Sequence, residues 1–160
     1  MIPGLDTTGE DERRTDAGAA RRKAMDRLAR REYGRTELVG KLIEDGFDPG
    51  TAGAVVERLT AEHLQDDARF AESLVSARIR QGKGPVRIRL ELAERGIEPA
   101  LVEQALADED WLTLARRVRE RRFGPELPAD FPDKARQMRF LQYRGFEPDQ
   151  IAAAVVANDP

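Results

Sequence analysis

The sequence predicts an all-α protein built from three tandem three-helix repeats, helix-turn-helix-like, that form an elongated curved array. The first observation is a repeated phrase of glycine, an apolar residue, an acid and proline, which occurs at 46–49, 96–99 and 145–148. The spacings between its glycines are 50 and 49 residues, the self-similarity expected of a repeat protein. The second is the helical periodicity of apolar residues, and the third is the lack of period-2 runs and Asn-Gly hairpin signals.

The first repeat is expected over residues 19–63, after a disordered tail at 1–18 that carries Pro, Gly, Thr and acids without apolar periodicity. Its first helix ends near Gly34, which can serve as the N-cap of the second helix. Gly46 ends that second helix, because the residue after a helix often takes a left-handed conformation that glycine enters without strain. The Asp-Pro pair that follows begins the third helix, with the acid as its cap and proline at its first position.

The second and third repeats, expected over 64–108 and 109–160, follow the same order. Asp66 caps the first helix of the second repeat, and the Gly-Lys-Gly-Pro segment at 82–85 ends it and begins the next. In the third repeat a connection with three of the chain's nine prolines delays the second helix until Asp133. The pattern therefore predicts about nine helices in three triplets.

Composition limits the classes of function. Of the 160 residues, 40% are hydrophobic, 36% are charged and 6% are aromatic, which favours thin helical layers over one thick core. The absence of cysteine excludes disulfides and thiolate metal sites and favours a reducing compartment. No apolar run is long enough to span a membrane, and the N-terminus lacks a signal core. We therefore expect a cytoplasmic monomer without a membrane, metal or cofactor; the net charge of −3 leaves nucleic-acid binding open.

Candidate catalytic and metal-binding residues have simpler interpretations. His63 is the only histidine and has no partners at metal-ligand spacing, so we interpret it as a surface or junction residue. An acidic pair at 66–67 and an acidic triplet at 108–110 each precede the start of a helix, where carboxylates cap free N–H groups. The glycines at 82–85 lack both the Walker spacing and a preceding strand, so a turn is favoured over a phosphate loop. These residues indicate that the protein is not an enzyme.

Four segments, in this order, resemble the bacterial RecX family of recombinase regulators over about residues 20 to 156. They are ARREY at 29–33 with Glu37 and Leu38, LQDDARFAE at 64–72, GKGPVRI at 82–88, and the run 134–151 that contains RFLQYRGF. Gly34 departs from the serine cap that is frequent in the family. The resemblance implies a non-enzymatic protein that binds the RecA filament. There it would inhibit strand exchange, ATP hydrolysis and the coprotease activity that triggers the SOS response during DNA recombination and repair.

Basic residues concentrate on the first and second helices of the repeats, and acids lie between them. Any single arginine is interpreted as part of a solvated face with i,i+4 pairs, but the segregation predicts a basic band that can meet DNA phosphates or an acidic protein face. From the resemblance and their place in this band, we expect these residues to contact the partner: Arg30, Arg31, Arg35, Lys83, Arg87, Lys134, Arg139 and Arg144.

Further interpretations stay open, among them a passive helical-repeat adaptor for some other partner. A direct DNA-binding protein with helix-turn-helix-like repeats is the main alternative, since such modules place a helix in the major groove of double-stranded DNA, and single strands are a further possible ligand. Most aromatic residues lie on or beside apolar faces and are expected in the core. Tyr143 lies off its helix's apolar stripe, so it stays open as a platform on which nucleic-acid bases could stack.

Overall fold

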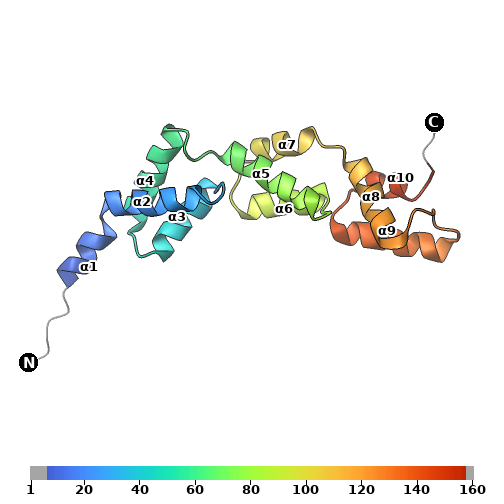
Figure 1. Cartoon of the computed structure of the whole chain (residues 1–160), viewed down its shortest axis with the longest axis horizontal. Helices are drawn as coiled ribbons and strands as arrows, with labels where there is room; N and C mark the ends of the chain where they lie inside the picture. The colour runs from blue at the N-terminus through green and yellow to red at the C-terminus, as the bar shows by residue number, and fades with distance from the viewer. Residues whose placement is uncertain (1–6, 158–160) are drawn as a thin grey trace, which may run out of the picture. The chain divides into compact units, whose positions relative to one another are not determined.

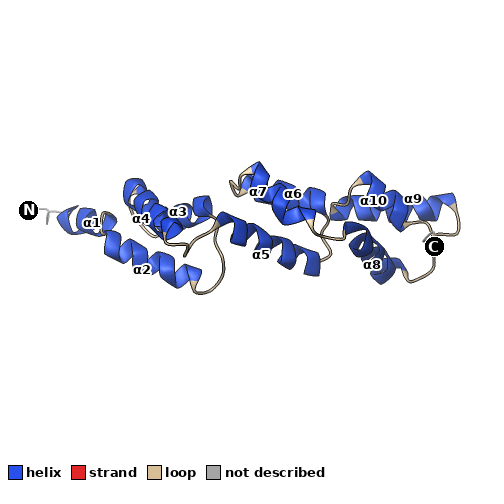
Figure 2. Cartoon of the chain, turned by 90° about the horizontal axis from the view of Figure 1, so that it is seen from above, coloured by secondary structure: helices blue, strands red, loops and turns tan. Residues whose placement is uncertain are grey.

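The structure, a computed structural model, describes residues 7–157 and has ten helices and no strand in that range (Figures 1 and 2). The helices are α1 (Thr7–Arg14), α2 (Ala17–Leu28), α3 (Arg35–Glu44), α4 (Pro49–Ala61), α5 (Asp67–Arg80), α6 (Pro85–Glu94), α7 (Pro99–Ala107), α8 (Trp111–Phe123), α9 (Phe131–Arg144) and α10 (Pro148–Ala154). The all-α prediction is confirmed. The chain divides into two compact units, Met1–Phe70 and Ala71–Pro160, which are described separately.

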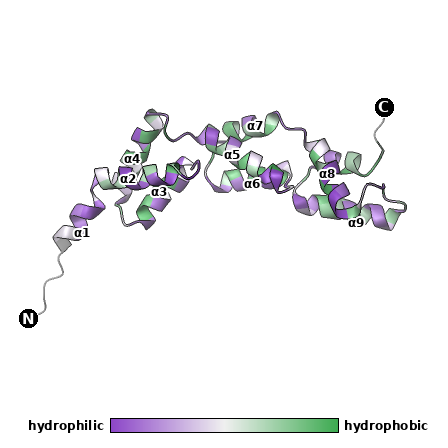
Figure 3. Ribbon diagram, viewed as in Figure 1, coloured by the Kyte–Doolittle hydropathy of each residue, from purple (hydrophilic) through white to green (hydrophobic). Residues whose placement is uncertain are grey.

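In the first unit α2, α3 and α4 pack on one another around a shared apolar core (Figure 1). Its fully buried side chains include Leu38, Leu42 and Leu59, and burial of each contributes about 2 kcal/mol. Asp48 accepts hydrogen bonds from the backbone of α4, and Pro49 takes the first helical position, as the sequence predicts. Helices α2, α3 and α4 each carry both hydrophilic and hydrophobic residues, the amphipathic pattern on which the helix prediction rests (Figure 3).

A helix also lies within the segment predicted to be a disordered tail, and this corrects the prediction for residues 7–14; residues 1–6 lie outside the described range. Glu10 lies in the first turn of α1 and Arg13 and Arg14 in the last, which complements the helix dipole. The backbone N–H of Asp48 donates to the carbonyl of Arg14 at 2.8 Å. Local charge and one tertiary hydrogen bond therefore stabilise a helix that has no apolar stripe.

In the second unit α8, α9 and α10 pack on one another, and α6 packs on α7. Leu114, Leu141, Phe146 and Ile151 form the buried centre of the α8–α10 core. The indole N–H of Trp111 donates to the carbonyl of Leu106 at 3.1 Å, which ties the start of α8 to α7. The second and third triplets thus belong to one compact unit.

The three repeated glycines end their helices in the same way. Gly46, Gly96 and Gly145 have φ values of 101°, 76° and 94°, in the left-handed region. In each case the next residue donates to the carbonyl five positions earlier, as Phe47 does to Leu42 at 3.1 Å. This is the Schellman arrangement, which satisfies carbonyls that the helix leaves free. The predicted helix ends are confirmed.

The backbones of Gly84 and Gly145 touch where α6 begins and α9 ends. Gly84 N donates to the carbonyl of Arg144 at 2.8 Å, and Val86 N donates to the carbonyl of Gly145 at 2.9 Å. A Cβ added to Gly84 would lie 2.4 Å from the carbonyl carbon and oxygen of Gly145. Only glycine therefore fits at this contact, which joins helices that are distant in sequence.

The proline-rich connection before α9 is held by a buried arginine. Arg119 is 2% exposed and donates to the carbonyl of Glu126 at 3.0 Å and to Oε1 of buried Gln137 at 3.4 Å. The helix that follows begins at Phe131 instead of Asp133, because the cap is Asp130, whose carboxylate accepts from Asp133 N at 2.8 Å. Proline is tolerated in the first turn of a helix, so Pro132 does not delay it.

Candidate functional site

The predicted contact residues of the first unit lie in the turn after α2 and at the start of α3. Arg30 and Arg31 lie in the turn after α2, and Arg35 is the first residue of α3. The Arg31 guanidinium pairs with Glu37 at 2.9 Å and lies 3.7 Å from the centroid of the Tyr33 ring. Arg31 therefore braces the turn, whereas the exposed Arg30 and Arg35 side chains have no ion pair among the described residues.

In the second unit the fold brings together three predicted contact residues, Lys83, Arg87 and Arg144. Lys83 and Arg87 lie on either side of Gly84 at the start of α6. Arg144 is the last residue of α9, and its carbonyl accepts the hydrogen bond from Gly84 N. Arg144 Nη1 donates to the carbonyl of Gln81 at 3.2 Å, and Arg87 Nη1 donates to that of Tyr143 at 3.4 Å. Backbone carbonyls thus orient Arg87 and Arg144, and neither forms an ion pair with a carboxylate in the part of the chain that the structure describes.

The remaining two predicted residues lie elsewhere on α9. Arg139 is exposed in the middle of the helix, and Lys134 is half-buried in its first turn. Lys134 is ten residues from Arg144, so their backbones are about 15 Å apart along the helix axis. The structure therefore does not gather all five predicted residues of the second unit into one site.

Two arginines that were not chosen from the sequence complete a basic cluster beside Arg144. Arg121 and Arg122 are exposed in the last turn of α8, and with Arg144, Phe140 and neighbouring residues they line a pocket of about 170 Å³. The guanidinium carbons of Arg122 and Arg144 lie 5.8 and 5.3 Å from the Phe140 ring centroid. Among the described residues, no carboxylate lines this pocket. None of the three arginines forms an ion pair with a described residue. We call Arg121, Arg122, Arg144 and Phe140 together the arginine pocket.

The same arginine-rich stretch of α8 that contains Arg121 and Arg122 also contains Arg119, which the fold buries. The signal that separates them is helical phase, because Arg119 follows the buried Ala115 by four residues and shares its face. Arg119 therefore belongs to the core of this segment, whereas Arg121 and Arg122 belong to its surface.

Other basic residues hold helices together through ion pairs. Arg78 of α5 makes a two-point contact with Glu91 of α6, with Nε to Oε2 at 2.7 Å. These hydrogen bonds hold the pKa of Glu91 below its ordinary value of 4.5 and raise the pKa of Arg78. Arg89 bridges Glu103 of α7 and Glu147 before α10 at 2.8 and 3.2 Å, which raises its pKa. These cations support the fold and are poor candidates for partner contacts.

Groups typical of catalysis or metal binding are sparse in the part of the chain that the structure describes. Among residues 7–157 no cluster of three or more His, Asp or Glu side chains could hold a metal ion. His63 has a φ of 60° and takes the left-handed position after α4, where it closes the helix as the repeated glycines do. None of the described helices has the length and apolarity needed to cross a membrane.

Comparisons with known families decide the relationship. Three family profiles match in order: the first RecX three-helix domain at residues 20–59, the second at 66–106 and the third at 108–155. The chain belongs to the RecX family. The resemblance stated from the sequence is thus confirmed, and so is the class of three-helix repeats.

Individual relatives agree over most of their length. The chain is 48% identical over 151 residues to the regulatory protein RecX of Halorhodospira halophila, covering 91% of this chain and 94% of the relative. It is also 48% identical over 135 residues to that of Pseudomonas savastanoi pv. phaseolicola, covering 83% and 87%. A crystal structure of RecX from Lactobacillus salivarius superimposes with a TM-score of 0.76 at 21% identity, covering 88% of this chain and 94% of that one. This structural similarity shows the fold.

Proposed function

We propose that this protein is a non-enzymatic cytoplasmic regulator that binds the RecA–DNA filament and inhibits RecA's ATP hydrolysis, strand exchange and coprotease activities. The observation that carries the proposal is the match of three consecutive RecX domains, together with the name "regulatory protein" borne by relatives at 48% identity. The protein acts as a monomer, without a cofactor.

The charges of the described residues support a binding role. Arg30 and Arg35 in the first unit and Lys83, Arg87, Arg139 and Arg144 in the second project cationic groups that no carboxylate among the described residues neutralises by an ion pair. A filament repeats the same surface at each protomer, so several weak contacts from one chain add avidity without a single strong site. Occupation of several protomers would then oppose the changes that accompany ATP hydrolysis and strand exchange.

Inhibition of RecA tests the proposal directly. Titration of the full chain into RecA with single-stranded DNA should lower the rate of ATP hydrolysis at near-stoichiometric or lower ratios, and less strongly at high salt. The double variant Arg30→Glu, Arg35→Glu should raise the concentration needed for half-inhibition several-fold. Arg58→Glu is the control for a charge reversal outside the predicted contact set, because its side chain is 76% exposed on α4 and it loses only a solvent-screened i,i+4 pair with Glu62 at 3.7 Å. Unchanged ATP hydrolysis and strand exchange at several-fold excess of the wild type would reject the proposal.

Direct competition for DNA is the alternative mechanism, and an excess of bare duplex DNA separates the two. A competitor of this kind loses its inhibition when bare duplex is added in excess, whereas a filament-binding regulator retains it as long as filaments persist. The buried helix N-terminus of α6 gives little support to duplex readout, since Gly84 and Pro85 are buried against α9 and cannot enter a groove. The filament proposal is therefore favoured.

A further inference from the structure

An exposed aromatic ring belongs to the residue that precedes Arg144 of the arginine pocket. Tyr143, near the end of α9, is 72% exposed, although burial of an aromatic side chain is normally favourable. The Arg87 guanidinium of α6 lies 5.2 Å from the centroid of its ring and donates to its carbonyl. The ring is thus held from a second helix while most of its surface faces solvent. Tyr143 lies off the buried face of α9 that carries Leu141, so the fold leaves its ring available to a ligand.

The residue that follows Tyr143 belongs to the pocket. Arg144 donates to the carbonyl of Gln81 and lines the arginine pocket with Arg121 and Arg122. Tyr143 thus immediately precedes a residue of a pocket whose three guanidinium groups have no ion pair among the described residues. Guanidinium groups bind phosphate oxygens through paired N–H donors. The pocket provides these donors at its rim and an aromatic surface from Phe140 within it.

Backbone contacts hold this arrangement rigidly. Gly84 and Val86 of α6 donate to the last carbonyls of α9 at 2.8 and 2.9 Å, so Arg87 and Tyr143 are fixed relative to each other. On the α6 side the adjacent hollow is lined by Lys83 and Arg87 but also by Glu91 and Glu94. The carboxylates make that side less favourable for anions, which leaves the α8 side for phosphates.

We propose that the surface formed by Tyr143, Arg87 and the arginine pocket binds single-stranded nucleic acid, with a base stacked on Tyr143 and backbone phosphates on Arg121, Arg122 and Arg144. Stacking on an aromatic ring combined with a basic track is the usual mode of sequence-tolerant single-strand binding. Bases within a duplex are stacked on one another and cannot lie on the ring. The inference deepens the proposed function, because it assigns this surface to the DNA strand of the filament and not to the recombinase.

Binding of a labelled oligothymidylate to the full chain, measured by fluorescence anisotropy at low salt without RecA, tests this assignment. Tyr143→Ala should weaken binding about tenfold, and Tyr143→Phe should retain it because the ring stays. The double variant Arg121→Gln, Arg122→Gln should weaken binding and lower the slope of log affinity against log salt by about 1.4, or about 0.7 for each phosphate that is no longer neutralised.

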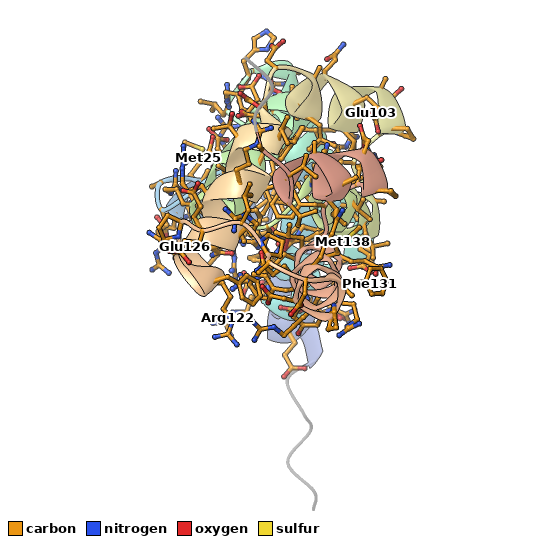
Figure 4. The ribbon with its side chains drawn as sticks, turned by 90° about the vertical axis from the view of Figure 1, so that its right-hand side faces the viewer. Met25, Glu103, Arg122, Glu126, Phe131 and Met138 are labelled. Carbon is orange, nitrogen blue, oxygen red and sulfur yellow. The ribbon has the colours of Figure 1, made fainter. Side chains whose placement is uncertain are left out.

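Phe131→Ala is the matched control for the loss of an exposed ring. Phe131 is 81% exposed at the other end of α9, and Figure 4 shows it on a different side of this part of the molecule from Arg122. Its removal should leave binding unchanged. Far-UV circular dichroism should be the same for all variants, since the substituted side chains are exposed.

The outcomes separate the two proposals. Three results would overturn the single-strand assignment. Tyr143→Ala could bind the oligothymidylate as tightly as the wild type does, or the wild type could bind duplex DNA as tightly as the oligothymidylate. Polyglutamate could also displace the labelled oligomer as well as unlabelled oligothymidylate does. If these variants bind the oligomer normally but lose inhibition of RecA, the surface contacts the recombinase and only this inference fails. If the wild type binds the oligomer as expected but does not inhibit RecA, the proposed function fails and this inference stands.

Discussion

Substitution of Gly84 by alanine tests whether the contact between α6 and α9 holds the second unit together. Gly84 has φ −85° and ψ 172°, which alanine adopts freely, so any cost must come from the contact itself. The added Cβ would lie 2.4 Å from the Gly145 carbonyl, about 1 Å closer than ordinary contact at 3.4 Å. Both partners are backbone, which cannot rotate away as a side chain can.

The expected loss follows from the two interactions that must yield. Overpacking in a close-packed region costs about 1–3 kcal/mol, and weakening of the two backbone hydrogen bonds of Gly84 and Val86 costs about 1 kcal/mol more. We therefore expect the free energy of unfolding to fall by about 2–4 kcal/mol and the melting temperature by about 5–15 °C. Urea titration followed by circular dichroism measures the first quantity and a thermal scan the second.

Amide hydrogen exchange locates the effect, because protection should fall at Gly84 and Val86, whose N–H groups make the two bonds. Gly40→Ala is the matched control: Gly40 lies within α3, and a Cβ there meets nothing within 4 Å. That variant should be more stable by up to about 1 kcal/mol, since alanine favours helix. Equal stability of Gly84→Ala and the wild type, with both amides still protected, would refute the reasoning.

Three further substitutions follow from the same structure. His63→Gly should stabilise the protein by about 1 kcal/mol in urea titrations, since His63 holds a φ of 60° that costs an L-residue about that much; a loss of stability would contradict this. Arg119→Ala should lower the free energy of unfolding by about 2–3 kcal/mol, because it leaves the Glu126 carbonyl and Gln137 Oε1 without their donor. Arg117 is exposed, so Arg117→Ala should change the free energy of unfolding by no more than about 0.5 kcal/mol. Equal effects of the two substitutions would place Arg119 at the surface. The pKa of Glu91 is depressed in the folded state, so its contribution to the free energy of unfolding is present above pH 4.5 and is lost as the pH falls through the folded-state pKa. Glu91→Gln should therefore make stability depend less on pH in this acid range. An unchanged pH profile would argue against the Arg78 contact.

The helices and their ends were predictable because their causes are local. The glycines that close α3, α6 and α9 and the acids that cap α4 and α5 act within one helical turn, so residue type and spacing suffice. The start of α9 was misplaced because two acids, Asp130 and Asp133, could each cap it. The choice depends on the connection that Arg119 holds from inside, which is a tertiary effect.

The first helix was missed for the opposite reason, since α1 has no apolar stripe that periodicity could detect. Its tertiary support is a hydrogen bond from the Asp48 backbone, and backbone donors carry no mark in the sequence. The repeat boundaries at 63/64 and 108/109 stay predictions. They lie close to the limits of the matched RecX domains.

The candidate site depends on contacts between distant segments, and for this reason sequence alone could name its residue types but not its members. Arg87 and Arg89 are two positions apart on α6, yet Arg87 is oriented toward Tyr143 while Arg89 is neutralised by Glu103 and Glu147. Charge reversal at Arg89 would break two ion pairs and confuse loss of binding with loss of fold. A charge variant that reports on the surface should therefore alter Arg87, Arg121 or Arg122, singly or together, because none of the three forms an ion pair with a described carboxylate that holds two helices together.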